Sequence, residues 1–250
     1  MSAPDTFGPR ASAYASFRPD YPEPLIAFVA SLAPARHLAW DCATGSGQAA
    51  VALAEHFEEV VATDHSERQL AQARPHPRVQ YRRAAAEKSG LPDSCADLVT
   101  VAQAMHWFDL PRFYMEVARV LVPGGALAVW TYGEPEFSDP KITELVRRFD
   151  LDTLDVWWQP GREHIRDGYR ELPFPFPEVD APPFLLERRW TLDELIGYLH
   201  SWSAVGTAVE ATGKDPVADL EPELTAVWGP RETRQLVRWP LTVRAGNLPS

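Results

Sequence analysis

Short apolar runs alternate with amphipathic segments over the first half of the chain. The runs predict buried strands, whereas the segments between them repeat apolar residues at spacings of three and four and predict helices. Because strands that alternate with helices join through right-handed crossovers, this order predicts a mostly parallel, doubly wound sheet. The predicted strands of this half are His37–Cys42, Val60–Thr63, Val79–Arg82, Ala96–Ala102 and Ala126–Tyr132.

Residues that cap helix N-termini precede several of the amphipathic segments. Ser66 with Gln69, and Thr191 with Glu194, form the capping-box pattern. A side-chain oxygen at such a position accepts from the first unpaired N–H groups of a helix, so these residues predict where helices begin. Aspartates mark three further expected starts, at Asp109, Asp139 and Asp215.

The second half of the chain changes character after residue 137. Residues 157–183 are rich in Pro, Phe and Trp and show no period, Phe184–Trp190 is strand-like, and residues 237–243 alternate as a half-exposed edge strand does. We therefore expect an α/β fold with a doubly wound, mostly parallel, seven-stranded sheet, an antiparallel edge strand and a helical C-terminal cap. The expected boundaries are a core with an N-terminal arm at 1–137, cap insertions at 138–183 and 191–232, and closing strands of the core sheet at 184–190 and 233–250.

The composition is that of a folded protein. The chain has 250 residues, 45% of them hydrophobic and 24% charged, which suits one large domain or one domain with a lid. The sum of 24 Lys and Arg against 35 Asp and Glu gives a net charge of −11. An acidic protein lacks the positive charge that supplies most nucleic-acid affinity and is repelled by anionic lipid. We therefore expect no nucleic-acid or membrane partner, while no pattern predicts an oligomeric state.

The sequence shows no targeting signal and no metal-binding motif. The N-terminal residues contain no apolar block of signal-peptide length, and no apolar run of about 18 residues occurs, so we expect a cytoplasmic protein. Cys42 and Cys95 form no CxxC pair, which argues against a disulfide framework or a thiolate metal site, and we expect both thiols to be buried. The seven histidines show no HExxH or clustered ligand spacing, so no metal is expected.

A glycine-containing turn follows the first predicted strand. Gly45 and Gly47 allow a ligand to approach the backbone where the strand leads into a helix, and an open α/β sheet binds ligands beyond the carboxyl ends of its strands. Asp64 ends the second predicted strand, where its carboxylate can accept both hydroxyls of a ribose. The sequence therefore predicts a cofactor that contains a nucleoside. Residues 45–50 also satisfy GxGxxA, so a nicotinamide dinucleotide is an alternative.

Further motifs accompany the glycine turn along the chain. An acidic residue, Asp41, lies four positions before Gly45. The other segments are Tyr14–Pro22, Asp41–Gln48, Ala86–Glu87, Ala96–Val99, Gln103–Phe108 and Arg119–Gly125. Together and in this order they resemble the motifs of class I S-adenosylmethionine-dependent methyltransferases, most strongly the small-molecule branch that includes trans-aconitate methyltransferases. The resemblance covers about residues 10–133 and implies a Rossmann-like methyltransferase fold.

The resemblance implies a site for S-adenosylmethionine. Ala43 stands where the family more commonly has glycine, so we expect no positive φ angle there. Arg18 is our hypothesis for the cofactor carboxylate, since a guanidinium suits that group, although a surface ion pair would explain it equally well. The other residues implied are Asp41, Ala43 and Gly45 at the methionine end, Asp64 at the ribose, His65, Ala86 and Glu87 around the adenine, and Gln103 closing the pocket.

The residues expected to meet the methyl acceptor are mostly aromatic. His106 follows the fourth predicted strand and can act as a base or a substrate donor, or can simply pack beside Trp107. The tryptophans after residue 137 can form an aromatic cage or the core of a lid. We take His106 as the catalytic candidate and Tyr14, Trp107, Trp158 and Trp202 as the substrate-binding candidates.

These features predict methyl transfer from S-adenosylmethionine to a small-molecule acceptor, with a carboxylate as one candidate group. A carboxylate needs no general base, whereas a hydroxyl or an amine would require one such as His106. Two alternatives stay open on the sequence. One is an NAD(P)-dependent oxidoreductase, and the other is a protein that binds S-adenosylmethionine without catalysis.

Overall fold

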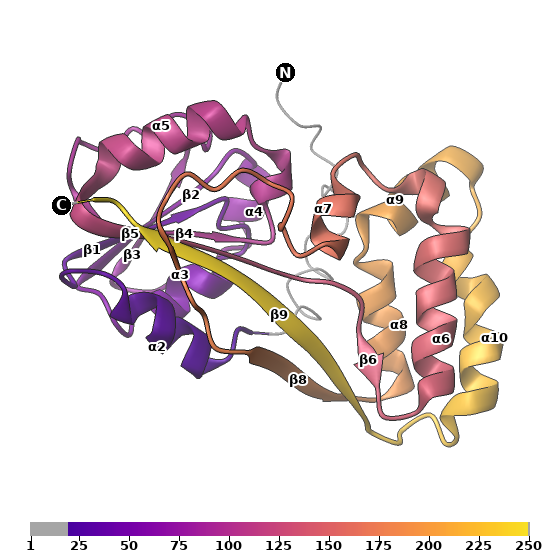
Figure 1. Ribbon diagram of the computed structural model, residues 1–250. Coiled ribbons are helices and arrows are strands. Elements are labelled where there is room, and N and C mark those ends of the chain that lie inside the picture. The colour runs from indigo at the N-terminus through magenta and orange to yellow at the C-terminus, as the bar shows by residue number, and fades with distance from the viewer. Residues whose placement is uncertain (1–19, 250) are drawn as a thin grey trace. The chain divides into compact units, whose positions relative to one another are not determined.

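The computed structural model describes residues 20–249 of the chain (Figure 1). Its helices are α2 (Glu23–Ser31), α3 (Gln48–Leu53), α4 (Glu67–Leu70), α5 (Leu110–Val120), α6 (Pro140–Arg148), α7 (Arg162–Arg166), α8 (Leu192–His200), α9 (Ser203–Thr212) and α10 (Pro216–Trp228). Its strands are β1 (Leu38–Cys42), β2 (Glu59–Asp64), β3 (Val79–Arg83), β4 (Ala96–Ala102), β5 (Leu121–Tyr132), β6 (Glu136–Phe137), β7 (Glu178–Val179), β8 (Phe184–Trp190) and β9 (Gln235–Asn247). Short helical turns of other types are η1 (Met105–Trp107), η2 (Phe149–Thr153) and η3 (Asp155–Trp157).

The strands form one sheet in the order β3-β2-β1-β4-β5-β9-β6, with β7 and β8 also paired to β9. β1 to β5 pair in parallel, and β9 runs antiparallel to β5. The predicted doubly wound, mostly parallel sheet with an antiparallel strand is therefore confirmed. Each of the seven predicted strands is present, and β6 and β7 are additional pairings of two residues each. Such short pairings leave no period in a sequence, so they could not be predicted.

Side-chain caps begin the helices where the sequence predicted them. Thr191 accepts from the Glu194 N–H, and the Glu194 carboxylate accepts from the Thr191 N–H, which completes the predicted capping box of α8. Asp109 accepts from the N–H of Arg112 at the start of α5. The predictions did not include α7 or α9. The first has five residues, and the second is rich in small residues that give a weak apolar face.

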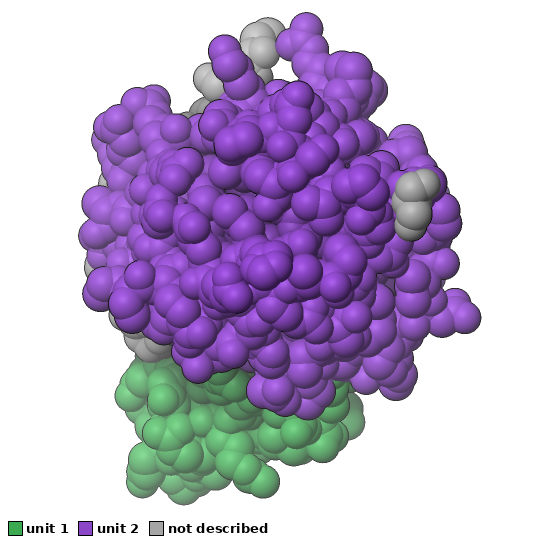
Figure 2. Space-filling model, turned by 90° about the vertical axis from the view of Figure 1, so that its left-hand side faces the viewer, with its two compact units in different colours: residues 1–19, 133–162, 185–240 green, residues 20–132, 163–184, 241–250 purple. Residues whose placement is uncertain are grey.

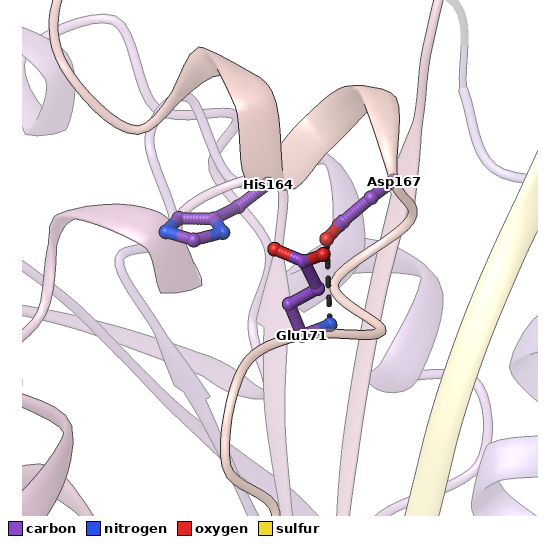
Figure 3. Close-up of side chains that lie close together, drawn as sticks. All are labelled: His164, Asp167 and Glu171. Atoms are coloured by element: carbon purple, nitrogen blue, oxygen red, sulfur yellow. Dashed lines mark hydrogen bonds between the residues drawn. The ribbon is translucent and has the colours of Figure 1, made fainter.

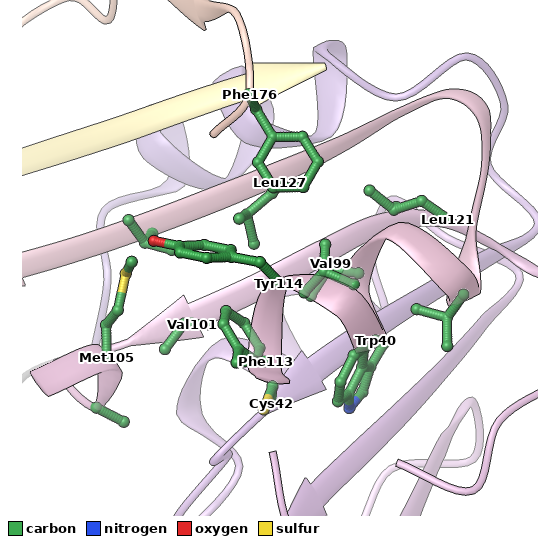
Figure 4. Packing of buried hydrophobic residues seen from close by; sticks show 14 of the residues in the cluster. Trp40, Cys42, Val99, Val101, Met105, Phe113, Tyr114, Leu121, Leu127 and Phe176 are labelled. Atoms are coloured by element: carbon green, nitrogen blue, oxygen red, sulfur yellow. The ribbon is translucent and has the colours of Figure 1, made fainter. Parts of the chain in front are cut away.

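The core lies between the parallel strands and the helices that cover them. Figure 1 shows α5 on one face of these strands and α2 and α3 on the other. On the α5 face, Phe113 packs against Trp40 of β1 at a centroid distance of 6.4 Å, and the cluster continues through Met105 (Figure 4). Fully buried aromatic side chains remove a large apolar area from water. This packing holds α5 against the face of the sheet.

The chain divides into two compact units (Figure 2). The first unit (purple, labelled unit 2 in Figure 2) contains the described residues 20–132, 163–184 and 241–249, and the second unit (green, labelled unit 1 in Figure 2) contains residues 133–162 and 185–240. The expected cap segment 138–183 is thus split, because residues 163–184 cluster with the parallel strands. In the second unit, α6, α8 and α10 lie side by side (Figure 1).

Two further expectations concern burial. None of the described helices has the length and apolar character that crossing a bilayer requires. Cys42 is buried, as expected, and burial raises the pKa of its thiol well above the ordinary value. Cys95 was expected to be buried, but it is partly exposed, because it precedes β4 in a loop where its thiol donates to the Pro92 carbonyl.

Candidate active site

The turn between β1 and α3 is built on left-handed backbone. Gly45 has a φ of 56° and Gly47 a φ of 81°. At Gly47 a side chain would also overlap the Tyr81 hydroxyl, which donates to the Arg74 carbonyl. Among the described residues, a Cβ at Gly45 would meet only the Gln69 Oε1 atom, at 3.9 Å. The turn is therefore closed toward β3 at Gly47 and open above Gly45, as a loop that receives a ligand must be.

The backbone of Ala43 contradicts the expectation that its φ is not positive. Its φ is 55°, so the position does adopt the left-handed conformation that its departure from glycine seemed to exclude. The chain reverses directly after β1, and Thr44 donates its N–H to the carbonyl of Thr63 at 2.9 Å. This contact with β2 holds the turn in a conformation that costs an alanine about 1 kcal/mol.

Asp64 ends β2 with both carboxylate oxygens directed at backbone N–H groups. Oδ2 accepts from Gly45 at 2.9 Å, and Oδ1 accepts from Ser66 at 2.8 Å. Each oxygen retains a further lone pair, so the carboxylate can accept two more donors such as vicinal hydroxyls. His65 is half exposed, and its Nδ1 lies 3.5 Å from Asp64 Oδ1. The predicted ribose acceptor thus also holds the glycine turn in place.

Asp41 is almost fully buried on β1 and accepts from two threonine hydroxyls. The Thr44 hydroxyl lies 2.5 Å from Oδ2, and the Thr100 hydroxyl of β4 lies 2.8 Å from Oδ1. Burial raises the pKa of Asp41 to about 6, against the lowering effect of the two hydroxyls. Its carboxylate therefore ties the turn to β4, which is a positioning contact that the sequence analysis did not anticipate.

Glu87 and Gln103 contact the backbone of neighbouring segments. Glu87 accepts from the N–H of Asp109 at 3.0 Å, and Ala86 beside it is half-buried. Gln103 has a φ of 59° after β4, donates to the Tyr132 carbonyl at 2.8 Å and accepts from the Thr131 hydroxyl at 2.5 Å. A non-glycine residue with positive φ is frequently part of a functional site. Gln103 also links the carboxyl ends of β4 and β5.

His106 lies in η1, directly after β4. Its Nδ1 is 3.0 Å from the hydroxyl of Tyr169, and its ring centroid is 4.5 Å from that of Trp107. Tyr169 is buried and has a φ of 62°, and its carbonyl accepts from Arg244 at 2.7 Å. The histidine is therefore both packed beside Trp107, which is 40% exposed, and oriented by a buried phenol.

Trp158 and Trp202 belong to the second unit and pack together at a centroid distance of 5.6 Å. Trp202 is buried against Phe149 and Tyr198. The Arg162 guanidinium lies over the Trp158 ring at 4.2 Å. Among the described residues, Arg162 Nε and Trp158 Nε1 are buried donors without an acceptor.

Two predicted residues, Tyr14 and Arg18, lie outside the described residues. Three residues that the sequence analysis missed are Thr100, Tyr169 and Arg162. Thr100 left a signal, because it is a polar residue inside an otherwise apolar run and its register places it opposite Asp41. Tyr169 and Arg162 lie in the stretch without a period, so only the tertiary structure could assign them contacts.

The first unit places the predicted cofactor residues, apart from Arg18, at or after the carboxyl ends of β1, β2, β3 and β4. Ser46 Oγ and Gln69 Oε1 are buried there without a partner among the described residues. An unpaired buried polar atom costs about 1–3 kcal/mol, so a ligand with hydroxyl or amino groups would satisfy atoms that the protein leaves open. These open polar atoms and the free lone pairs of Asp64 fit a nucleoside.

Comparison with known proteins gives consistent matches. Residues 40–129 match a family model described as "Methyltransferase domain". A protein of Dictyostelium discoideum named as a methyltransferase is 35% identical over 223 residues, covering 88% of this chain and 85% of its own. The methyltransferase cfoB of Aspergillus candidus is 39% identical over 229 residues, covering 81% of this chain and 70% of its own. A solved structure from Anaeromyxobacter dehalogenans, named as a type II methyltransferase, is 48% identical, with a TM-score of 0.86 and coverage of 94% and 100%.

Proposed function

The chain belongs to the S-adenosylmethionine-dependent methyltransferases, and from this premise we propose that its acceptor is a small molecule with a carboxylate group. S-adenosylmethionine supplies a methyl group that its sulfonium activates, so the protein has mainly to orient the acceptor and exclude water. A carboxylate is a sufficient nucleophile for such a donor without a general base.

The observation that carries the proposal is the pair of buried donors in the second unit. Arg162 Nε and Trp158 Nε1 have no acceptor among the described residues, and the Arg162 side chain is 15% exposed. Its Nη2 lies 3.4 Å from Asp150 Oδ2, a long contact that leaves other guanidinium N–H groups available. A guanidinium beside an indole N–H suits a carboxylate, since both donate to its oxygens. We assign anion recognition to Arg162 and Trp158, with Trp202 supporting the Trp158 ring.

The first unit is assigned to the cofactor. Asp64 is proposed to accept the ribose hydroxyls, because its oxygens keep free lone pairs while its backbone contacts fix its position. Asp41 and Gln103 are proposed to hold the turn and the strand ends, through Thr100 in the case of Asp41. Ala43, Gly45, His65, Ala86 and Glu87 complete the proposed set.

His106 is proposed to contact the acceptor rather than to remove its proton. Tyr169 holds Nδ1 and so fixes the ring orientation, and we assign Nε2 as the nitrogen that meets the substrate. For a carboxylate acceptor, a donor at this position neutralises part of the anion during binding. For a hydroxyl or an amine acceptor, the same nitrogen would act as a base.

The experiment incubates the protein with labelled S-adenosylmethionine and a set of carboxylic acids, with matching alcohols and amines as controls. A carboxylate acceptor yields a methyl ester, which mild base hydrolyses to volatile labelled methanol. Methyl ethers and methylamines survive this treatment. Label that is transferred but not released by base would overturn the carboxylate assignment.

The variant Arg162→Met tests the anion site. Removing a charged hydrogen-bonding partner should raise KM for the acceptor about tenfold or more and leave the affinity for S-adenosylhomocysteine unchanged. Arg147→Met is the matched control, because Arg147 is a half-exposed arginine paired with Glu144 in the same unit. An equal KM for the acceptor in both variants would show that Arg162 does not bind the acceptor.

A further inference from the structure

Three potential metal ligands gather in and just after α7, outside the candidate active site. Atoms of His164, Asp167 and Glu171 that could each bind a metal lie within 4.8 Å of one another. Figure 3 shows the three side chains turned toward one another, with the Glu171 carboxylate between the other two. From the cluster and its unpaired atoms, we propose that it binds a first-row divalent cation, with Zn²⁺ as the best fit.

Unsatisfied atoms are the second and independent observation. His164 and Asp167 are partly buried residues, and their Nδ1 and Oδ1 atoms are buried without a hydrogen-bond partner among the described residues. The other Asp167 oxygen accepts from the Glu171 N–H at 3.3 Å, which aims the carboxylate at the cluster. When the imidazole proton is on Nε2, His164 Nδ1 is an acceptor like the Asp167 oxygen, and two acceptors cannot satisfy each other. A cation satisfies both at once.

The backbone frame of the cluster is rigid. Gly168 and Tyr169 are both left-handed, with φ of 69° and 62°, and they reverse the chain so that Glu171 returns to His164. Arg244 donates to the carbonyls of Tyr169 and Leu172, each at 2.7 Å. Such a frame reduces the entropy that ordering the ligands would cost on binding.

The donor set selects the class of ion. Zn²⁺ accepts both imidazole nitrogen and carboxylate oxygen as ligands, and a site with three protein ligands leaves the fourth position to water. Ligands at roughly 2.1 Å from Zn²⁺ in a tetrahedral site are about 3.4 Å apart, so the cluster must contract modestly on binding. Glu171 is exposed and can make this movement without disturbing the core. Mg²⁺ and Ca²⁺, which prefer oxygen ligands, should bind more weakly.

Occupancy of this site has a consequence for the first unit. The cation would close the turn from His164 to Glu171, and this turn carries Tyr169, whose hydroxyl contacts His106. We therefore expect a structural ion that stabilises the turn rather than an ion that takes part in methyl transfer.

Calorimetry on the metal-free, untagged full chain with Zn²⁺ tests the proposal. We expect one equivalent to bind, with Asp167→Asn and Glu171→Gln each weakening the affinity at least tenfold. Glu171 is exposed, so its variant keeps the fold even where the Asp167 variant does not. His37→Gln is the control, because His37 pairs with Glu58 at the surface as a two-residue imidazole and carboxylate pair. It should bind Zn²⁺ as the unaltered protein does.

Mn²⁺ titration followed by electron paramagnetic resonance gives a second readout, in which the same two variants should lose the bound signal. Binding should also raise the unfolding temperature of the unaltered protein and not that of Glu171→Gln. No bound equivalent in the unaltered protein, or equal affinity in Glu171→Gln and His37→Gln, would overturn the proposal.

Discussion

Some residues at the turn after β1 both fix the backbone of the turn and offer atoms to a ligand. Asp64 fixes the turn by accepting from two backbone N–H groups and keeps lone pairs for a ligand. Ala43 after β1 and Gln103 after β4 both adopt left-handed backbone. Backbone strain of this kind persists only where surrounding contacts impose it. Here the hydrogen bonds of Thr44 and Gln103 impose it, and the same hydrogen bonds shape the site.

Asp64→Asn should weaken S-adenosylhomocysteine binding at least tenfold, measured by calorimetry. The amide offers one acceptor oxygen in place of two and loses the charge, and hydrogen bonds to a charged group contribute about 1.5–3 kcal/mol. Asp97→Asn is the matched control. Asp97 is a buried carboxylate that accepts from the N–H groups of His37 and Leu38 at the opposite end of β1. A similar loss of affinity in both variants would contradict the role of Asp64.

Ala43→Gly should leave stability unchanged or raise it by up to ~1 kcal/mol in urea denaturation. Glycine adopts a φ of 55° without steric cost, and this gain offsets the greater freedom of glycine in the unfolded chain. The control Ala52→Gly lies inside α3 and should lose about 1 kcal/mol, because helical backbone gives glycine no such advantage. Equal losses in the two variants would show that residue 43 is not strained.

At the scale of elements, buried polar contacts join the strand ends. Asp41 of β1 binds Thr100 of β4, and Gln103 after β4 binds the Tyr132 carbonyl at the end of β5. Hydrogen bonds across parallel strands fix the carboxyl edge of the sheet, which is where an open α/β sheet binds its ligand.

The stability contribution of Asp41 should depend on pH. Its pKa is raised to about 6 in the folded chain from an ordinary 3.8, so the folded state binds the proton more tightly than the unfolded state does. The resulting stabilisation is fully present below pH 3.8 and is lost as the pH rises through about 6. A shift of two pKa units corresponds to about 3 kcal/mol as an upper figure.

Asp41→Asn removes this titration and can keep both hydroxyl contacts, since an amide both donates and accepts. The difference in unfolding free energy between unaltered protein and variant, measured in urea from pH 4 to pH 7.5, should therefore fall as the pH rises. Other titrating groups cancel in this difference. A difference that stays constant across the range would mean that Asp41 does not titrate there.

At the scale of the whole molecule, ligand binding and the stability of the folded state are linked. A ligand that binds only the folded state stabilises it, by about 2.7 kcal/mol at one hundred times its Kd. For a chain of this length such a gain raises the unfolding temperature by roughly 5–10 °C. S-adenosylhomocysteine should produce this shift in a thermal scan, and NAD should not. A shift with NAD alone would favour the oxidoreductase that residues 45–50 allowed.

The sequence was sufficient where the signal is local. Apolar runs and, at residues 237–243, alternation predicted the seven strands, and capping residues such as Thr191 predicted helix starts, because these signals depend on neighbours within a few positions. The glycine turn and Asp64 were predictable for the same reason, since the end of a strand and the start of a helix define their places.

Contacts between distant residues needed the tertiary structure. Tyr169 meets His106 across 63 positions of sequence, and Thr100 meets Asp41 across 59. The positive φ of Ala43 depends on the hydrogen bond from the Thr44 N–H to the Thr63 carbonyl of β2. The residue type alone had indicated that φ would not be positive there, which was wrong. Periodicity reports which face of an element is buried, but only the packed chain decides which polar atoms then meet and which stay open for a ligand.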